Sequence, residues 1–123
     1  MFEVEFYKLE NGERPVISFL NTLDKKMRTK AAMSLQLLEQ YGNQLREPQS
    51  KYIEDGIFEL RIKFSSDITR IFYFFFRDNK IILTNGFIKK TQKTPRSELN
   101  KAKKYKLDYE RRAANERVAG LYK

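Results

Sequence analysis

The 123-residue sequence contains no cysteine and no histidine. The lack of cysteine excludes disulfides and thiolate metal sites, and it fits a reducing cytoplasm, where we expect the protein to reside. Without histidine as well, zinc loses its usual nitrogen and sulfur ligands, so we expect no metal and no other cofactor. The side chain that most often serves as an acid or base near neutral pH is also missing. Any catalysis must therefore use Lys, Arg, Tyr, Asp or Glu.

The sequence also lacks a hydrophobic run long enough to cross a membrane. The longest apolar run, IFYFFF at residues 71–76, has the length of a strand, far below the roughly 18 residues of a membrane span. The N-terminal stretch MFEVEFYKLE is acidic and alternating, so we do not expect a signal peptide. With 41% hydrophobic and 14% aromatic residues, the chain has enough apolar side chains for a single packed domain over residues 1–123.

Positive charge is unevenly spread along the chain. Residues 1–50 hold seven Lys/Arg and seven Asp/Glu, whereas residues 51–123 hold eighteen and nine, so the whole net charge of +9 lies in the second part. Such asymmetry favours a polyanionic partner, and nucleic acid is the first candidate. The alternative is a soluble protein with one basic helix.

Apolar patterns predict four strands. The segment IFELRIKF places its apolar side chains on one face and its charged side chains on the other, as in a half-buried strand. The next segment, DITRIFYFFFR, is apolar on both faces, which is typical of a central strand. Short turns at residues 65–67 and 78–79 join neighbouring strands, and residues 43–50 are predicted as a polar loop. The predicted strands cover residues 2–7, 57–64, 67–77 and 80–88.

Helix signals surround these strands. Pro15 suits a first helical turn, Asp24 is placed to cap a second helix, and Gly42 is a stop signal for it. A last helix is predicted to begin at Pro95, and residues 113–123 are expected to fray. The order β-α-α-β-β-β-α predicts an α+β fold, in which a mainly antiparallel sheet packs against a helical hairpin and a C-terminal helix.

Two arginines are predicted to face each other in the sheet. Arg61 lies on the polar face of its strand, and Arg70 lies among apolar residues in the next one. If residues 65–66 form the tip of an antiparallel hairpin, the two arginines are directly opposite, where like charges repel. Such a pair makes sense if an anion lies over it. The alternative is that each arginine pairs with a carboxylate, for which Glu59 and Asp67 are the candidates.

A group of lysines follows at the end of the last strand. The segment GFIKKTQKTP at residues 86–95 places three lysines within five positions. In a three-stranded antiparallel meander, the end of the third strand returns beside the start of the second. We therefore expect Lys89 and Lys90 to converge with Arg61 and Arg70 on one face of the sheet.

Three segments of the chain resemble the HigB toxins, a phage-related branch of the RelE superfamily of bacterial toxin–antitoxin proteins. They are GIFELR (56–61), RIFYFFF (70–76) and GFIKKTQKTP (86–95). The last is the most specific of the three, and the resemblance extends from the N-terminal strand to about residue 112. It implies a RelE-like fold with active-site roles for Arg61, Arg70, Lys89 and Lys90.

The resemblance also implies a function and a partner. Toxins of this kind are ribosome-dependent mRNA endonucleases that use no metal, and they cleave through attack of a ribose 2′-OH on the adjacent phosphate. The implied partner is a helix-turn-helix antitoxin of the HigA type, bound in a toxin–antitoxin hetero-oligomer. Some RelE-superfamily toxins use a histidine near the site. This sequence has none, so the identity of the general base stays open.

A lysine is one candidate for that base. A free lysine titrates near about 10.4. A cation about 6 Å away, at an effective dielectric of about 20, costs on the order of 2.8 kcal/mol and lowers that pKa by roughly two. Lys89 or Lys90, crowded by an arginine, is therefore predicted to act as a base near physiological pH. A lysine that only stabilises negative charge has the same sequence pattern.

Five further residues near the cluster have two interpretations each. Tyr73 is a possible acid or base, although strand alternation points it away from the arginines and into the core. Phe72 and Phe74 share the arginine face and are candidates for stacking on RNA bases, or for simple packing. Gln92 and Lys93 are candidates for phosphate contacts or for capping the next helix.

Two non-enzymatic functions fit the same sequence. A nucleic-acid-binding module would use the last helix and the lysines only to neutralise phosphates. A purely structural partner would use the basic face to bind an acidic segment of another protein, such as an antitoxin. Both alternatives use the positive charge of residues 51–123 without any bond cleavage.

Overall fold

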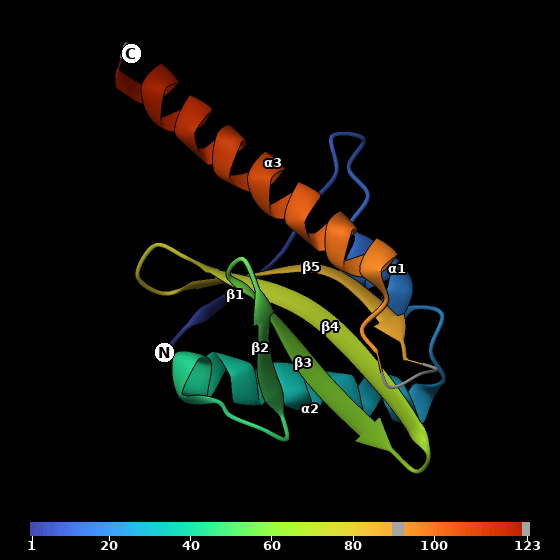
Figure 1. Cartoon of the computed structure of the whole chain (residues 1–123). Coiled ribbons are helices and arrows are strands. Elements are labelled where there is room, and N and C mark those ends of the chain that lie inside the picture. Colours follow the sequence, from blue (N-terminus) through green and yellow to red (C-terminus); the bar gives the residue numbers. More distant parts are fainter. Residues whose placement is uncertain (90–92, 122–123) are drawn as a thin grey trace.

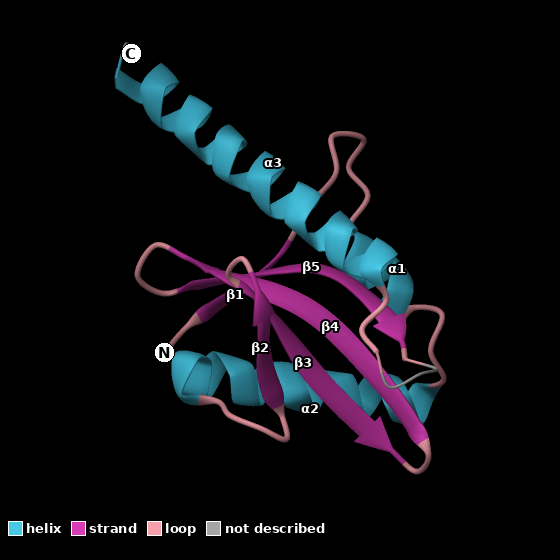
Figure 2. Cartoon of the chain, viewed as in Figure 1, coloured by secondary structure: helices cyan, strands magenta, loops and turns pink. Residues whose placement is uncertain are grey.

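The computed structural model describes residues 1–89 and 93–121, and it arranges them around a five-stranded sheet (Figures 1 and 2). The elements are β1 (Glu3–Phe6), α1 (Pro15–Leu20), α2 (Lys25–Tyr41), the 3-10 helix η1 (Gly42–Gln44), β2 (Ser50–Glu54), β3 (Ile57–Phe64), β4 (Asp67–Phe76), β5 (Lys80–Ile88) and α3 (Arg96–Leu121). The strand order in the sheet is β1-β5-β4-β3-β2. β1 runs parallel to β5, and all other neighbours are antiparallel.

The sheet separates two hydrophobic cores. One face packs against α1 and α2, where Val16, Ala31 and Leu38 are fully buried. The other face packs against α3, where Leu99 and Ala102 cover aromatic side chains of β4 and β5. Figure 1 shows α2 and α3 on opposite sides of the sheet, with the C-terminal turns of α3 extending past the strands. The predicted α+β class and mainly antiparallel sheet are therefore confirmed.

Local signals in the sequence set both ends of α2. The Asp24 side chain accepts a hydrogen bond from the Met27 N–H at 2.8 Å, as expected of an N-cap. Gly42 follows the last turn with a φ of 49°, a conformation that glycine adopts without steric strain. The predicted cap and stop of this helix are both confirmed.

The sequence prediction missed one strand. β2 begins at the last residue of the predicted polar loop 43–50 and pairs with β3, with Ser50 opposite Leu60. Its side chains are mostly exposed or half-buried, so it lacks the apolar alternation that marks the other strands. The element order is thus β-α-α-β-β-β-β-α, with one strand more than predicted.

α3 differs from its predicted bounds at both ends. It begins at Arg96, one residue after the predicted start at Pro95. It remains helical to Leu121, although residues 113–123 were predicted to fray. The reason lies in composition, because no proline interrupts this stretch and its Ala, Glu and Arg residues are strong helix formers.

Candidate active site

The register of the β3–β4 hairpin brings two arginines together. Phe64 pairs with Asp67 across a two-residue turn, and the antiparallel register then places Arg61 directly opposite Arg70. Directly opposed residues of an antiparallel pair project from the same face of the sheet. The Arg70 side chain is 8% exposed and that of Arg61 is 24% exposed. The predicted pairing of the two arginines is therefore confirmed.

A buried carboxylate lies between the arginines. Glu59 precedes Arg61 by two positions on the same face of β3, and its side chain is 0% exposed. Its Oε1 lies 3.2 Å from Arg61 Nε and 3.5 Å from Arg70 Nη1. Asp67, the other predicted partner, forms no ion pair within the described part of the chain. Both arginines thus have Glu59 as a carboxylate partner, and the exposed Glu47 lies 3.6 Å from Arg61 as well. These carboxylates offset the repulsion between the two guanidinium groups.

Two polar atoms of this cluster have no hydrogen-bond partner among the described residues. They are Glu59 Oε2 and Arg70 Nε, and both are buried. Burial lowers the pKa of Arg70; Glu59 opposes that effect and Arg61 adds to it. An arginine nonetheless stays protonated at neutral pH. The Arg70 guanidinium therefore keeps unused hydrogen-bonding capacity for an anionic ligand.

Lys89 belongs to the same cluster. It follows β5 directly, and its backbone N–H donates to the carbonyl of Ile68 on β4 at 3.2 Å. Burial is the largest cause of a lowered Lys89 pKa; Glu59 opposes it, and the arginines and Lys51 lower the pKa further. The direction agrees with the prediction for a crowded lysine. The cause differs in part, because loss of solvent contributes more than the neighbouring cations.

The other predicted residues of this loop are only partly described. Lys90 and Gln92 lie outside the residues that the structure describes. Lys93 is exposed and lies three positions before the first residue of α3. The roles predicted for these three residues in catalysis, phosphate contact or helix capping therefore stay predictions.

Phe72, Tyr73 and Phe74 of β4 lie inside the protein, which corrects two predictions. Phe72 and Phe74 are fully buried in the core under α3, so neither can stack on an RNA base. Tyr73 is 1% exposed on the opposite face, where its hydroxyl shares a hydrogen bond with Ser50 Oγ. Burial raises the Tyr73 pKa, and the Ser50 contact opposes the rise. An acid or base role for Tyr73 is wrong because RNA cannot reach it, and its core interpretation is confirmed.

A groove of about 410 Å³ opens beside the two arginines, and the sequence analysis missed much of its lining. Lys63 could have been found from the sequence, because it is the next residue on the polar face of β3 after Arg61. Lys30 could not, because it lines the groove only through the packing of α2 against β3. The lining residues are Lys30, Ser34, Leu37, Pro48, Gln49, Arg61, Lys63, Ile68 and Arg70.

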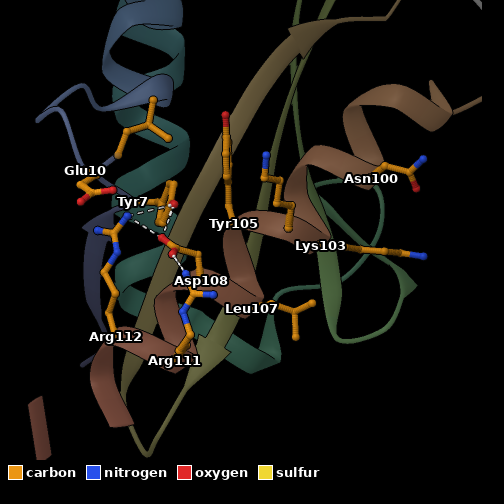
Figure 3. A pocket seen from close by; sticks show the side chains of 11 residues that line it. Tyr7, Glu10, Asn100, Lys103, Tyr105, Leu107, Asp108, Arg111 and Arg112 are labelled. Carbon is orange, nitrogen blue, oxygen red and sulfur yellow. Dashed lines mark hydrogen bonds and ion pairs between the residues drawn. The ribbon is translucent and has the colours of Figure 1, made fainter. Parts of the chain in front are cut away.

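A larger hollow, of about 690 Å³, lies between α3 and the segment after β1 (Figure 3). Its polar groups bind one another. The Tyr7 hydroxyl donates to Asp108 Oδ2 at 2.5 Å, and Asp108 also pairs with Arg111 and Arg112 at 2.6 and 2.5 Å. The Tyr7 ring stacks on Tyr105 with 4.5 Å between centroids. These contacts fasten α3 to the N-terminal part of the chain, so we assign this hollow a structural role.

The candidate site consists of Arg61, Arg70 and Lys89 around one buried carboxylate, that of Glu59. In residues 1–89 and 93–121, no three His, Cys, Asp or Glu side chains are grouped so that they would hold a metal ion. No helix in the same part of the chain is long and apolar enough to cross a membrane. Arg61 and Arg70 have the planar donor groups that bind two phosphate oxygens at once, and Lys89 is the amine beside them.

The candidate site lies within the part of the chain that matches a known family. A family model described as phage-derived protein Gp49-like (DUF891) matches residues 18–106, which is well over half of the chain. The matched span contains Glu59, Arg61, Arg70 and Lys89. A search of curated proteins gave no match. The chain belongs to the Gp49-like family, which is associated with RelE- and HigB-like toxins of toxin–antitoxin systems.

Proposed function

We propose that this protein is the toxin of a type II toxin–antitoxin system and a metal-independent endoribonuclease that cleaves mRNA on the ribosome. The observation that carries the proposal is the convergence of Arg61, Arg70 and Lys89 around one buried carboxylate. Membership of a family associated with toxins supports the biological setting. The resemblance of the three sequence segments to HigB supports the choice of mRNA as substrate.

The two arginines would stabilise the charge that develops on the phosphate. Attack of a ribose 2′-OH forms a bond to phosphorus and passes through a phosphorane-like state with extra negative charge on its oxygens. Arg61 and Arg70 present fixed, permanently charged donors, which is the kind of preorganised group that favours such a state over the ground state. Glu59 holds both donors in place without reaching solvent.

Lys89 would take the proton from the 2′-OH. Only the neutral amine can accept a proton, and the lowered pKa increases the neutral fraction at physiological pH. The P–O5′ bond then breaks, which leaves a 2′,3′-cyclic phosphate and a free 5′-oxygen. That oxygen takes a proton from water or from a protonated lysine of the same loop. The proton acceptor and the groups that stabilise charge are all side chains of the protein, so the proposed mechanism needs no metal.

The proposal also includes a partner. A helix-turn-helix antitoxin of the HigA type would bind the protein in the cytoplasm and keep it inactive. The cations that line the groove, Lys30 and Lys63 beside the two arginines, suit an acidic segment of such a partner as well as RNA. Native mass spectrometry of the protein co-expressed with its operon neighbour would detect the complex. Absence of a stable complex would count against this part of the proposal.

Mapping of mRNA ends after induced expression tests the proposed activity. We expect cuts at fixed positions of the reading frame that disappear when translation is blocked. Arg70→Lys should abolish the cuts, because it keeps a charge near Glu59 but loses the two-pronged contact with phosphate. Arg28→Ala, an exposed change on α2, is the matched control and should cleave normally. Growth arrest without any new mRNA ends would contradict the nuclease and favour a non-catalytic binding module.

A further inference from the structure

The groove beside the arginines lies where one edge of the sheet is uncovered. The pairing of β2 with β3 stops at Ser50 and Leu60, so residues 61–64 of β3 extend beyond β2 toward the hairpin tip. The Arg61 N–H donates to the Gln49 carbonyl at 2.8 Å, at the point where the segment before β2 separates from β3. α2 packs on this part of the sheet and provides the opposite wall. The groove is therefore bounded by α2, the segment before β2, and the β3–β4 hairpin.

The lining combines apolar and basic side chains. Leu37 of α2 is 39% exposed and lines the groove together with Pro48 and Ile68. Lys30 and Lys63 lie among the same lining residues, with the two arginines beside them. None of the described residues that line the groove is acidic. A surface of this kind suits a ligand that has a flat ring, whose faces pack on apolar side chains, and a negative charge, and a nucleotide has both.

The two lysines of the groove are available for a ligand. Lys30 and Lys63 form no ion pair with any residue that the structure describes, whereas Lys103 of the basic helix α3 is paired with Glu54. Arg70 adds an independent observation, because its side chain is 8% exposed and its Nε has no partner among the described residues. A buried, unsatisfied donor in a groove lined by cations points to an anion that completes the site.

We infer that this groove binds the nucleotide of the mRNA next to the scissile phosphate, with its base against Leu37, Pro48 and Ile68 and its phosphate between Lys30 and Lys63. The inference rests on the proposed function, and it adds a wall of α2 to a site otherwise built from strands. The volume of about 410 Å³ falls in the roughly 300–1,000 Å³ range of small-ligand sites. The strand of RNA would then run from the arginine cluster across the uncovered end of β3 toward α2.

Two charge reversals test the inference. The purified protein is titrated with a labelled RNA oligonucleotide that carries a 2′-deoxy sugar at the cleavage site, and cleavage is measured separately on programmed ribosomes. Lys30→Glu and Lys63→Glu should each weaken binding and raise the KM of cleavage, with kcat unchanged, because neither lysine touches the reacting atoms. Each loss should also make binding less dependent on salt, because it weakens the contact with that phosphate.

Lys26→Glu is the matched control, since it makes the same change on an exposed residue of α2 that does not line the groove. If all three variants bind and cleave RNA as well as the wild type does, the groove inference is overturned and the proposed nuclease activity is retained. Binding that depends on Lys30 and Lys63, with no cleavage by the wild type, would overturn the proposed function and retain the groove as an RNA site. A wild type that neither binds nor cleaves would overturn both.

The apolar part of the groove has a test of its own. Leu37→Ala should weaken binding of the intact oligonucleotide several-fold, because it removes the surface against which the base packs. The same oligonucleotide without a base at the nucleotide beside the cleavage site should bind wild type and Leu37→Ala equally. A Leu37→Ala effect that persists with the abasic oligonucleotide would show that this residue acts on the fold and not on the base.

Discussion

Glu59 is the residue on which the geometry of the arginine cluster depends. It is fully buried, and its only described partners are the guanidinium groups of Arg61 and Arg70. A buried ion pair contributes little net stability compared with an apolar replacement, but removal of one partner leaves an uncompensated charge. Here removal would leave two arginines facing each other across the hairpin. Glu59 therefore determines where the two guanidinium groups lie.

Glu59→Gln should lower the free energy of unfolding by about 3 kcal/mol, at the low end of the range for a broken buried pair because Arg61 is partly solvated. Urea denaturation at neutral pH measures this difference. Glu47→Gln is the control: that side chain is 62% exposed and lies 3.6 Å from Arg61, so its removal should change stability by no more than about 1 kcal/mol. Equal midpoints for the two variants would mean that Glu59 does not hold the cluster together.

The pH dependence of cleavage should reveal Lys89 as the base. The rate rises with pH as the amine loses its proton, and the lowered pKa places this rise below the ordinary value of 10.5. Lys89→Arg keeps the positive charge but cannot lose its proton, so the rise should disappear. Glu59→Gln removes the charge that raises the Lys89 pKa and should move the rise to lower pH. If Lys89→Arg and Lys90→Arg both retain the wild-type profile, no lysine is the base.

For single residues, the sequence predicts pairing within a hairpin but not burial by a distant helix. Arg61 and Arg70 were placed opposite each other because a two-residue turn fixes the register of a hairpin without any distant contact. Phe72 and Phe74 share the arginine face, yet they are buried because α3 lies over that part of the sheet. Strand periodicity identifies a face, but it does not tell which part of that face a distant helix covers.

At the scale of elements, the packing of α1 on β5 depends on a glycine of the GFIKKTQKTP segment. A side chain at Gly86 would place its Cβ 2.4 Å from Phe19 Cδ2 of α1, far closer than real contacts allow. The glycine is therefore explained by the close approach of a helix to the strand. This glycine belongs to the most specific segment of the HigB resemblance, and the structure gives it a packing reason.

Gly86→Ala should destabilise the protein by about 1–3 kcal/mol, the usual cost of an overpacked core. Gly120→Ala is the matched control, because nothing lies within 4 Å of its added Cβ, and in a helix alanine is favoured by up to about 1 kcal/mol. Thermal unfolding of both variants, followed by circular dichroism, measures the two effects. Destabilisation of equal size at both positions would contradict a specific Gly86–Phe19 contact.

The missing strand shows a second limit of the sequence analysis. β2 contains Lys51 and Tyr52, both exposed, so no face of it is apolar. Its pairing depends on the hairpin at Asp55-Gly56, where both residues have positive φ. Besides its backbone hydrogen bonds to β3, this edge strand is held by individual contacts, such as the Ser50–Tyr73 hydrogen bond and the ion pair of Glu54 with Lys103. Such contacts leave no alternating pattern in the sequence. Period-two patterns therefore find central strands more readily than edge strands.

For the whole molecule, the basic segment that stands out in the sequence is not the surface where, among the described residues, unpaired cations gather in the fold. Much of the basic charge lies on α3, but Lys103, Arg111 and Arg112 of this helix are paired with carboxylates. The groove combines cations from α2 and the β3–β4 hairpin, which no single stretch of sequence displays. Charge counts along the sequence predict an anionic partner as a class, but only the fold locates the cations that would be available to it.

α3 itself divides into a part that packs and a part that projects. Its first four turns cover the sheet, and Asp108 and Arg112 connect it to Tyr7 and to the Lys8 carbonyl. Residues 114–121 are all exposed, and Figure 1 shows these turns extending beyond the strands. The projecting part makes no contribution to either hydrophobic core.

Removal of residues 114–123 should therefore leave the free energy of unfolding within about 0.5 kcal/mol of the full chain, as for other changes remote from buried features. The helical circular dichroism signal should fall, because the deleted turns are helical. Truncation after Lys106 is the contrasting variant: it removes Asp108, Tyr109 and Arg112, and with them the hydrogen bonds of the Tyr7 hydroxyl and the ring packing on Phe74. That shorter chain should unfold at much lower urea concentration. If the two truncations destabilise the protein equally, the projecting turns contribute to folding in a way that their exposure does not account for.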